Sequence, residues 1–225
     1  MDRLNRTRLL LGNDAVKKLA DATVMIVGCG AVGSFSAEAL ARTGVGHMIL
    51  VDFDVIEESN INRQLFALGS TIGMAKVDAA AARIRDINPK ADVTTLNLFW
   101  DNGTDIPQRP DFVIDAIDSV DSKIALYKWC NRFGIPFISS MGAARRCDMS
   151  NIKIAPISKT SVCPLAARIR KIVRTENIPE FDVVYSTVPP MAGTMPGRTF
   201  GSLVTVTGTF GLMMANYIIN EIIHQ

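Results

Sequence analysis

Three glycines and one aspartate have the spacing in this chain that best fits a chemical role. Gly28, Gly30 and Gly33 form the pattern G-x-G-x-x-G, and Asp52 follows about twenty residues later. In that pattern the first glycine makes a tight turn, the second lets backbone N–H groups approach a phosphate, and the third lets a helix pack closely on a strand. An aspartate at this distance accepts hydrogen bonds from a ribose. The set predicts a nucleotide-binding site; the alternative is a glycine turn that only packs a helix on a sheet.

The segments around these residues predict the βαβ unit that such a site needs. Residues 23–27 are apolar and β-branched, which indicates a buried parallel strand, and residues 47–51 indicate a second one. Between them, residues 34–42 indicate a helix whose N-terminus adds positive potential beside the glycines. A phosphate would therefore lie where the first strand meets that helix.

Helical and strand-like segments continue to alternate, which predicts a largely parallel sheet. We expect further helices at 75–87, 122–133 and 164–173, and further strands at 92–98, 112–117, 137–140, 151–157 and 183–185. The strand at 112–117 carries Asp115 near its carboxyl end, with Asp118 just beyond, where open α/β sheets bind ligands. The predicted fold is α/β and Rossmann-like, with a largely parallel central sheet, helices on both faces and an elaborated C-terminal part.

The chain length suits one structural unit. We divide the 225 residues into an N-terminal arm and helix at 1–20, a nucleotide-binding core at 21–140 and a C-terminal part at 141–225, which includes a crossover loop at 188–198. The apolar run at 203–219 is interrupted by threonine, glycine and asparagine. It is short for a membrane span of about 20 residues, so we expect a buried strand and helix there.

The N-terminus and the cysteines both favour a cytoplasmic protein. Arg3, Arg6 and Arg8 precede a helix that Asn13 or Asp14 is expected to cap, on a polar segment that is not typical of a signal peptide and could reach a neighbouring subunit. The four cysteines, at 29, 130, 147 and 163, form no C-x-x-C pair. This argues against a disulfide scaffold and against structural zinc.

Positive charge is concentrated in the C-terminal part. Residues 139–174 contain eight basic residues and one acidic residue, so their net charge is +7, which leaves −5 for the rest of a chain whose total is +2. Such a segment suits the phosphate backbone of a nucleic acid, or it is a solvated surface without a partner.

The remaining polar residues favour adenylyl transfer over hydride transfer. The only histidines, His47 and His224, are not placed as a proton relay for a dehydrogenase. Arg63 and Lys76 could neutralise charge that grows on a triphosphate, and Asp118 could hold a Mg²⁺ that bridges its phosphates. Taken separately, each is better explained as an ordinary surface charge. Together, downstream of the glycine pattern, they predict a site that uses ATP.

Several motifs together resemble the ThiF/MoeB/HesA family, the bacterial relatives of ubiquitin-activating enzymes. They are the glycine pattern, Asp52-Phe-Asp54, Ser59-Asn60-Ile61-Asn62-Arg63-Gln64, Gly73-Met-Ala-Lys76, Asp115-x-x-Asp118 and the N-terminal Arg3-Leu-Asn-Arg6. The resemblance implies a homodimer that binds ATP with Mg²⁺ and adenylates a carboxylate. The missing C-x-x-C pairs predict that it does so without zinc.

Position by position, the resemblance implies roles for individual residues. Asp52 would hold the ribose, Asp118 would coordinate Mg²⁺, and Arg6 would reach the ATP of the partner subunit. The residues expected to bind the nucleotide are Gly28, Gly30, Gly33, Asp52, Asp54, Asn60, Arg63, Gln64 and Lys76. Those expected to act in catalysis are Arg6, Arg63, Lys76 and Asp118.

Within the family, the chain resembles the branch of tRNA threonylcarbamoyladenosine dehydratases, called TcdA or CsdL. The motifs are Asp115-Ala-Ile-Asp-Ser-Val, Ser139-Ser-Met-Gly-Ala and Lys159-Thr-Ser-Val-Cys-Pro-Leu-Ala, although Ala144-Arg145-Arg146 stands where that branch often has Gly-Asn-Lys. The resemblance implies that the threonyl carboxylate of the tRNA nucleoside is activated as an acyl-adenylate and closes into a ring, with loss of one water. The expected tRNA contacts are Arg145, Arg146, Lys159, Arg168 and Lys171.

Two other functions remain open. One is adenylation of the C-terminus of a ubiquitin-like sulfur-carrier protein, with a sulfur-relay protein as partner, which the missing C-x-x-C zinc pairs disfavour. The other is a non-catalytic nucleotide-binding scaffold, which the complete set of ATP-contacting residues disfavours. Cys163, before Pro164 at an expected helix N-terminus, is placed where a thiolate is favoured. We interpret it as a packing residue, because ring closure within the substrate needs no enzyme nucleophile.

Overall fold

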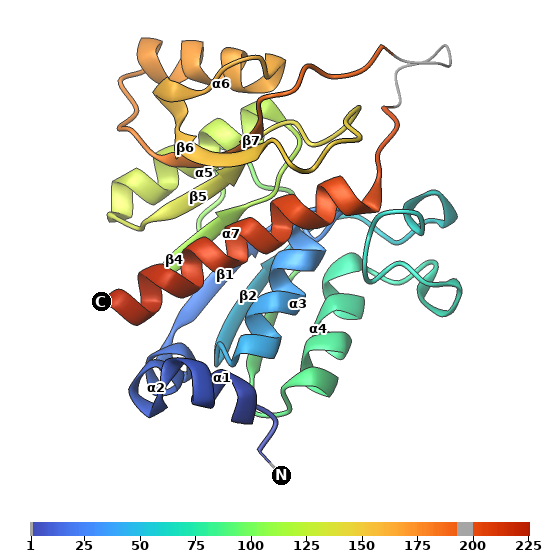
Figure 1. Cartoon of the computed structure of the whole chain (residues 1–225), viewed down its shortest axis with the longest axis vertical. Coiled ribbons are helices and arrows are strands. Elements are labelled where there is room, and N and C mark those ends of the chain that lie inside the picture. Colours follow the sequence, from blue (N-terminus) through green and yellow to red (C-terminus); the bar gives the residue numbers. More distant parts are fainter. Residues whose placement is uncertain (1, 193–199) are drawn as a thin grey trace.

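The computed structural model describes residues 2–192 and 200–225, and its centre is one seven-stranded sheet (Figure 1). The strands are β1 (Thr23–Val27), β2 (His47–Val51), β3 (Asp92–Leu96), β4 (Phe112–Asp115), β5 (Phe137–Ser140), β6 (Ile152–Pro156) and β7 (Asp182–Ser186). Their order is β3-β2-β1-β4-β5-β7-β6, and every neighbouring pair is parallel except β7 with β6. The expectation of a largely parallel Rossmann-like sheet is confirmed.

Helices cover both faces of the sheet, as expected. The α-helices of the described residues are α1 (Asn5–Leu11), α2 (Asn13–Asp21), α3 (Gly33–Thr43), α4 (Lys76–Ile87), α5 (Val120–Phe133), α6 (Pro164–Thr175) and α7 (Val204–His224). Short 3₁₀ helices occur at Glu58–Asn60, Gly69–Thr71 and Ile157–Lys159. Helices α3, α4 and α7 pack on one face, and α5 and α6 pack on the other (Figure 1).

The strands divide their side chains between two hydrophobic cores, because successive residues of a strand point to opposite faces. Val24 and Ile26 of β1 belong to the core beneath α3, α4 and α7, whereas Met25 and Val27 belong to the core beneath α5 and α6. All four are at most 2% exposed, which is why β1 is apolar throughout. The glycine pattern begins at the residue after this buried strand.

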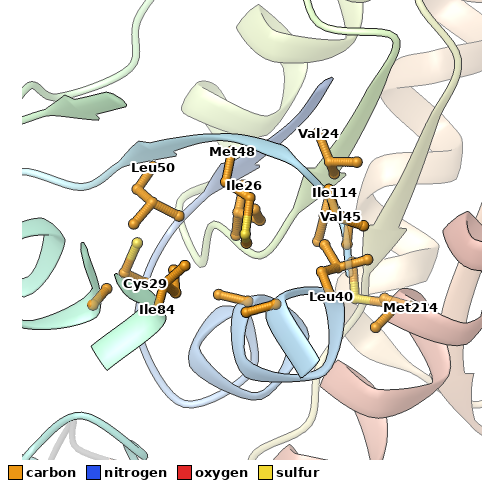
Figure 2. Packing of buried hydrophobic residues seen from close by; sticks show 14 of the residues in the cluster. Val24, Ile26, Cys29, Leu40, Val45, Met48, Leu50, Ile84, Ile114 and Met214 are labelled. Carbon is orange, nitrogen blue, oxygen red and sulfur yellow. The ribbon is translucent and has the colours of Figure 1, made fainter. Parts of the chain in front are cut away.

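Figure 2 shows the first of these cores, where Val24 and Ile26 meet Leu40 of α3, Ile84 of α4 and Met214 of α7. These side chains are fully buried. Burial of one such side chain contributes about 1.5–3 kcal/mol relative to leaving it exposed. The core therefore fixes where β1 ends and where α3 begins, and with them the glycine turn between the two.

The C-terminal apolar run is one helix, α7, and not the strand and helix that we expected. Its glycines lie at the contact with α3: an added Cβ on Gly211 would overlap the carbonyl oxygen of Val32, and one on Gly208 would meet the ring of Phe35. The small residues that interrupt the apolar run are thus the ones that let the two helices approach. No helix in the described part of the chain is long and apolar enough to cross a membrane.

The N-terminal segment is more helical than expected. Arg6 and Arg8 lie inside α1 rather than ahead of the first helix. The second helix begins after Gly12, whose φ of 87° separates the two, so Asn13 is the first residue of α2 and not its cap. With seven residues and none of them buried, α1 lacks the apolar periodicity that would reveal a helix in the sequence.

Candidate functional site

The strand ends meet at a cavity of about 800 Å³. Because β1, β2, β4 and β5 are parallel, the segments that follow them lie along one edge of the sheet. Each contributes to the cavity wall: the glycine loop after β1, residues 52–54 after β2, residues 116–119 after β4 and residues 140–146 after β5. The N-terminus of α6 adds to the wall beyond β5. The volume is in the range of cavities that hold small ligands.

The glycine loop has the backbone that a tight turn requires. Gly28 has a φ of 94°, and an added Cβ there would lie 2.7 Å from the carbonyl oxygen of Ala116. A Cβ on Gly33, the first residue of α3, would overlap the carbonyl group of Gly28. Gly30 also lines the cavity but differs in its surroundings, because the nearest atom to an added Cβ, Gln64 Nε2, would lie 3.8 Å away. Gly28 and Gly33 are therefore required by close packing, whereas Gly30 leaves its backbone accessible from the cavity.

Asp52 follows β2 and connects the loops on either side of it. One carboxylate oxygen accepts the N–H of Cys29 at 2.7 Å, and the other accepts the N–H of Asp54 at 2.9 Å. Burial raises the pKa of Asp52 above that of an ordinary aspartate, although these two N–H groups and the Lys76 ammonium counteract part of the rise. Each oxygen keeps capacity for a ligand hydroxyl, since a carboxylate has about four acceptor positions. Cys29 itself is buried in the loop, and burial raises the pKa of its thiol.

Lys76 and Asp54 form a close ion pair in the same wall. Lys76 Nζ lies 2.7 Å from Asp54 Oδ2, and the Lys76 backbone N–H donates to the Asp54 carbonyl oxygen at 3.0 Å. Lys76 is 7% exposed, so the pair is held at the start of α4 with little freedom. Arg63 and Gln64 also line the cavity, and Arg63 Nη1 donates to the carbonyl oxygen of Ser59 at 2.8 Å. Cationic and amide donors of this kind suit the oxygens of a phosphate.

Asn60 is not among the described residues that line the cavity. Its Oδ1 accepts the N–H of Glu57 at 3.2 Å and caps the short helix Glu58–Asn60, and its side chain is 7% exposed. The carbonyl oxygen of Asn60 accepts the Arg63 N–H at 3.1 Å. Direct contact of Asn60 with the nucleotide stays a prediction. Its hydrogen bond to the Arg63 backbone instead fits a role in positioning Arg63.

Asp118 lies on the cavity wall after β4, with an exposed side chain. A buried ion pair holds the loop that carries Asp118. Lys123 Nζ lies 2.7 Å from Asp115 Oδ2, and both side chains are 0% exposed. The second oxygen of Asp115 accepts the N–H of Ile117 at 3.0 Å. Lys123 also donates to the carbonyl oxygen of Ser140 at 2.8 Å. This pair, which the sequence did not indicate, therefore joins the loop after β4 to the segment after β5.

Arg6 is not near this cavity. It is exposed on α1, which lies with α2 at the opposite edge of the sheet, where Leu4 packs against Gly44 and the Gly46 N–H donates to Leu19 at 3.0 Å (Figure 1). Gly44 and Gly46 precede β2, so this is the edge at which the parallel strands begin. The structure therefore does not bring Arg6 to the cavity of its own chain.

An exposed aromatic pair belongs to the site although sequence reasoning missed it. The rings of Phe53 and Phe99 meet edge to face with their centroids 5.0 Å apart, and the residues are 53% and 51% exposed. Both line the cavity on the side of β2 and β3. Such a pair offers a flat apolar wall against which a base can stack. Their positions in the sequence could have indicated this pair, because Phe53 and Phe99 follow strands that end at the same edge of the sheet as the glycine loop.

At the other end, Gly142, Arg146 and the start of α6 form the cavity wall. Arg146 is 3% exposed, and its Nε donates to the carbonyl oxygen of Gly142 at 2.9 Å. Cys163 precedes Pro164 at the N-terminus of α6, is 2% exposed, and has its Sγ 3.4 Å from where a Cβ on Gly142 would lie. Cys163 therefore packs tightly against the segment after β5, as the interpretation of a packing residue expects.

The basic residues of the C-terminal part do not form one surface. Lys159, Arg168 and Lys171 are exposed on or beside α6, whereas Arg145 and Arg146 line the cavity, and Arg146 is buried there. Arg146 is therefore separated from the exposed cations, and its burial does not fit the expected contact with the tRNA backbone. Charge density along a chain does not reveal which side chains turn inward, and the left-handed backbone at Arg145, with a φ of 61°, redirects the chain just before Arg146.

Arg145 contacts the described part of the expected crossover loop at 188–198 and also the chain just beyond that loop. The Arg145 N–H donates to the carbonyl oxygen of Gly201 at 2.8 Å, and its Nε donates to that of Met191 at 2.6 Å. Residues 193–198 of this loop lie outside the described residues. Arg145, on the cavity wall, thus links Met191 to Gly201.

Comparison with known sequences identifies the family. The model of the ThiF family matches residues 4–225. This chain belongs to the ThiF family. It is 44% identical over 195 residues to the tRNA threonylcarbamoyladenosine dehydratase of Bacillus subtilis strain 168, a match that covers 85% of this chain and 77% of that protein. It is 36% identical over 248 residues to the protein of the same name from Escherichia coli strain K12, with 97% and 92% covered.

The solved structure of a related protein has the same fold. Escherichia coli TcdA, the tRNA N6-threonylcarbamoyladenosine dehydratase, in complex with ATP superposes with a TM-score of 0.91 at 35% identity. The match covers 99% of this chain and 94% of that one. The resemblance to the ThiF family that the motifs indicated is confirmed, as is the dehydratase branch among its relatives.

Proposed function

We infer that this protein is an ATP-dependent tRNA threonylcarbamoyladenosine dehydratase. The observation that carries this inference is the match, over nearly the whole chain, with enzymes of that name, including one solved with ATP. The cavity supports it, because its two ends differ: the glycine loop and Lys76 line one end, and Arg146 and α6 line the other. These matches favour dehydration over adenylation of a sulfur-carrier protein. A sulfur-relay protein partner stays a prediction.

ATP would lie with its ribose at Asp52 and its phosphates over the glycine loop. Lys76, Arg63 and Gln64 would contact the phosphates, since all three line the cavity. Asp54 would act through Lys76, which it holds at 2.7 Å. Fixed cations at this position stabilise the charge that develops on the phosphate under attack, and they need no rearrangement to do so.

Asp118 would hold Mg²⁺. Among the described residues, no group of three or more His, Cys, Asp or Glu is placed to hold a metal ion. A single exposed carboxylate on the cavity wall nevertheless fits Mg²⁺, which is usually bound by one or two carboxylates together with substrate phosphates and water. When bound, the ion would neutralise charge on the triphosphate.

The proposed reaction has two steps. An oxygen of the threonyl carboxylate attacks the α-phosphorus of ATP, the bond to pyrophosphate breaks, and an acyl-adenylate forms. A nucleophilic atom of the same modified nucleoside then attacks the acyl carbon and loses its proton to solvent. AMP leaves and carries away the former carboxylate oxygen. Ring closure needs little beyond orientation once the carboxylate is activated. Overall, the nucleoside loses one water while ATP is cleaved to AMP and pyrophosphate, as in a ligase-type reaction. Cys163 takes part in neither step.

The exposed cations beside α6 would hold the tRNA backbone. Arg168 and Lys171 lie three residues apart on α6, so they share one helix face, and Lys159 ends the short helix that precedes α6. The first residues of α6 line the cavity. A tRNA bound along this helix would therefore have its modified nucleoside close to the cavity.

Nucleoside mass spectrometry tests the proposed function. Purified protein, ATP, Mg²⁺ and tRNA that carries uncyclised threonylcarbamoyladenosine should give an ATP-dependent loss of one water from that nucleoside. Asp118→Ala should lower the rate by about a hundredfold or more, because the metal anchor is lost. Asp121→Ala, a matched control on the exposed first turn of α5, should keep the wild-type rate. Absence of product from the wild-type protein in the presence of bound ATP would contradict the proposed function.

The protein would act as a homodimer in which Arg6 reaches the ATP of the partner subunit. Arg6 lies at the sheet edge opposite to the cavity of its own chain, and α1 exposes Leu9 and Leu10, which are 74% and 82% exposed. Arg6→Ala and Lys76→Ala proteins should each be inactive alone. Mixed heterodimers should regain activity, because one cavity then has both residues. Confirmed heterodimers without activity would exclude this arrangement.

A further inference from the structure

Arg146 is a buried cation for which the described residues offer no anionic partner. It is 3% exposed and lines the cavity. Its Nε is bonded to Gly142, but its buried Nη1 has no hydrogen-bond partner among residues 2–192 and 200–225. A guanidinium stays charged at neutral pH, and a buried charge that remains unpaired is strongly destabilising. An anion that enters the cavity would relieve this cost.

The N-terminus of α6 faces the same end of the cavity. Cys163, Pro164 and Leu165 line the wall, and no side chain caps the helix. The unpaired N–H groups of a first helical turn carry partial positive charge. Gly142 joins the two features, because its carbonyl oxygen accepts a hydrogen bond from Arg146 Nε and a Cβ added to it would lie 3.4 Å from Cys163 Sγ. A buried guanidinium and a helix N-terminus therefore make this end of the cavity electropositive.

The sheet order indicates which anion belongs there. Along the carboxyl edge, the segments after β2, β1, β4 and β5 bring Asp52, the glycine loop, Asp118 and Arg146 in that sequence. With the ribose at Asp52 and the phosphates over the glycine loop, a second reactant must approach from the side of β5. We propose that Arg146 binds the carboxylate of the substrate, directs it toward the α-phosphate and selects against uncharged analogues. This proposal rests on the proposed function and replaces the expected contact of Arg146 with the tRNA backbone.

Binding of a matched pair of nucleosides tests the proposal directly. Threonylcarbamoyladenosine and its carboxamide, in which a neutral amide of similar size replaces the reacting carboxylate, are titrated into the protein saturated with a non-hydrolysable ATP analogue. The wild-type protein should prefer the acid by about tenfold or more, as a charge-assisted hydrogen bond predicts. Arg146→Gln should reduce the acid-to-amide ratio to near one. Arg146→Lys should retain part of the preference, because it keeps the charge but loses the planar fork.

Two controls separate this role from a structural one. Arg146→Gln should bind the ATP analogue as the wild-type protein does, which shows that the variant is folded. Arg132→Gln removes an exposed guanidinium from the last turn of α5 and should keep the wild-type ratio. The proposal is overturned if the wild-type protein shows no preference for the acid, or if Arg146→Gln keeps the wild-type acid-to-amide ratio. If Arg146→Gln keeps this ratio but loses affinity for the ATP analogue, the guanidinium is assigned to a nucleotide phosphate instead. Failure of the proposed function is detected by a separate assay, in which the wild-type protein would not dehydrate the nucleoside.

Discussion

The two ends of the cavity differ in how far the protein satisfies its own polar groups. At the nucleotide end, Asp52 accepts two backbone N–H groups, and Lys76 is paired with Asp54. At the β5 end, Nη1 of Arg146 has no partner within the described ranges, and the N-terminus of α6 has no side-chain cap. One end is therefore organised by contacts within the protein, whereas the other has donors that no residue of the described ranges satisfies.

Backbone strain is divided between the two ends in the same way. The positive φ of the nucleotide end falls on Gly28, where it carries no steric penalty. The β5 end places positive φ on Arg145 and Val162, each next to a residue of the cavity wall. A left-handed conformation costs about 1–2 kcal/mol for a residue with a side chain, and it is rare for a β-branched one. Strain of this kind collects at functional sites when the surrounding structure enforces it.

The largest effect is expected where the two ends join. Lys123→Met would leave Asp115 buried and unpaired beneath both loops, so we expect a loss of about 3–5 kcal/mol in the free energy of unfolding. The matched control is Lys128→Met, also on α5, which removes a half-exposed pair with Glu176 and should cost about 1 kcal/mol or less. Urea unfolding followed by tryptophan fluorescence measures both. Equal stability of the two variants would show that the buried pair does not support the cavity.

A smaller effect is expected for tRNA binding and should be confined to the β5 end. Replacing Lys159, Arg168 and Lys171 by Gln should reduce the slope of log affinity against log salt by about 2–3, because three phosphate contacts no longer release counterions. Affinity for ATP should not change. A triple control at Lys17, Lys90 and Arg132, which are all exposed, should leave the slope as it is. Salt-independent tRNA binding by the wild-type protein would exclude this surface.

The smallest effect is expected from relief of strain. Val162→Gly should raise the free energy of unfolding by about 1 kcal/mol, because glycine adopts a φ of 63° without penalty and little burial is lost. Val162 and Val55 are both 50% exposed, but only Val162 has a positive φ. Val55→Gly should therefore destabilise the protein by about 0.5–1 kcal/mol. If both variants are destabilised alike, Val162 is not strained and the contrast between the two ends is weaker than proposed.

Local patterns in the sequence predicted the nucleotide end well. The run at 23–27, the glycines at 28, 30 and 33 and the helix that follows are neighbours in the chain, and they became β1, the turn and α3. Strand periodicity and glycine conformation depend on short segments, so they are visible without knowledge of the fold. The distance of Asp52 from the glycines and the positive charge of Lys76 were enough to propose both as nucleotide-binding residues, and both line the cavity.

The tertiary structure alone decided the direction of side chains and the contacts between distant segments. The apolar run with glycines became α7 because Gly208 and Gly211 let it pack on α3. Arg6 lies at the far edge of the sheet, and Arg146 turns inward while Arg168 remains exposed. Burial depends on which residues of other segments arrive beside a side chain, and no local pattern records this. The sequence by itself therefore determined the fold class and the family and predicted a nucleotide site, whereas the structure determined which cations line the cavity and which lie on the surface.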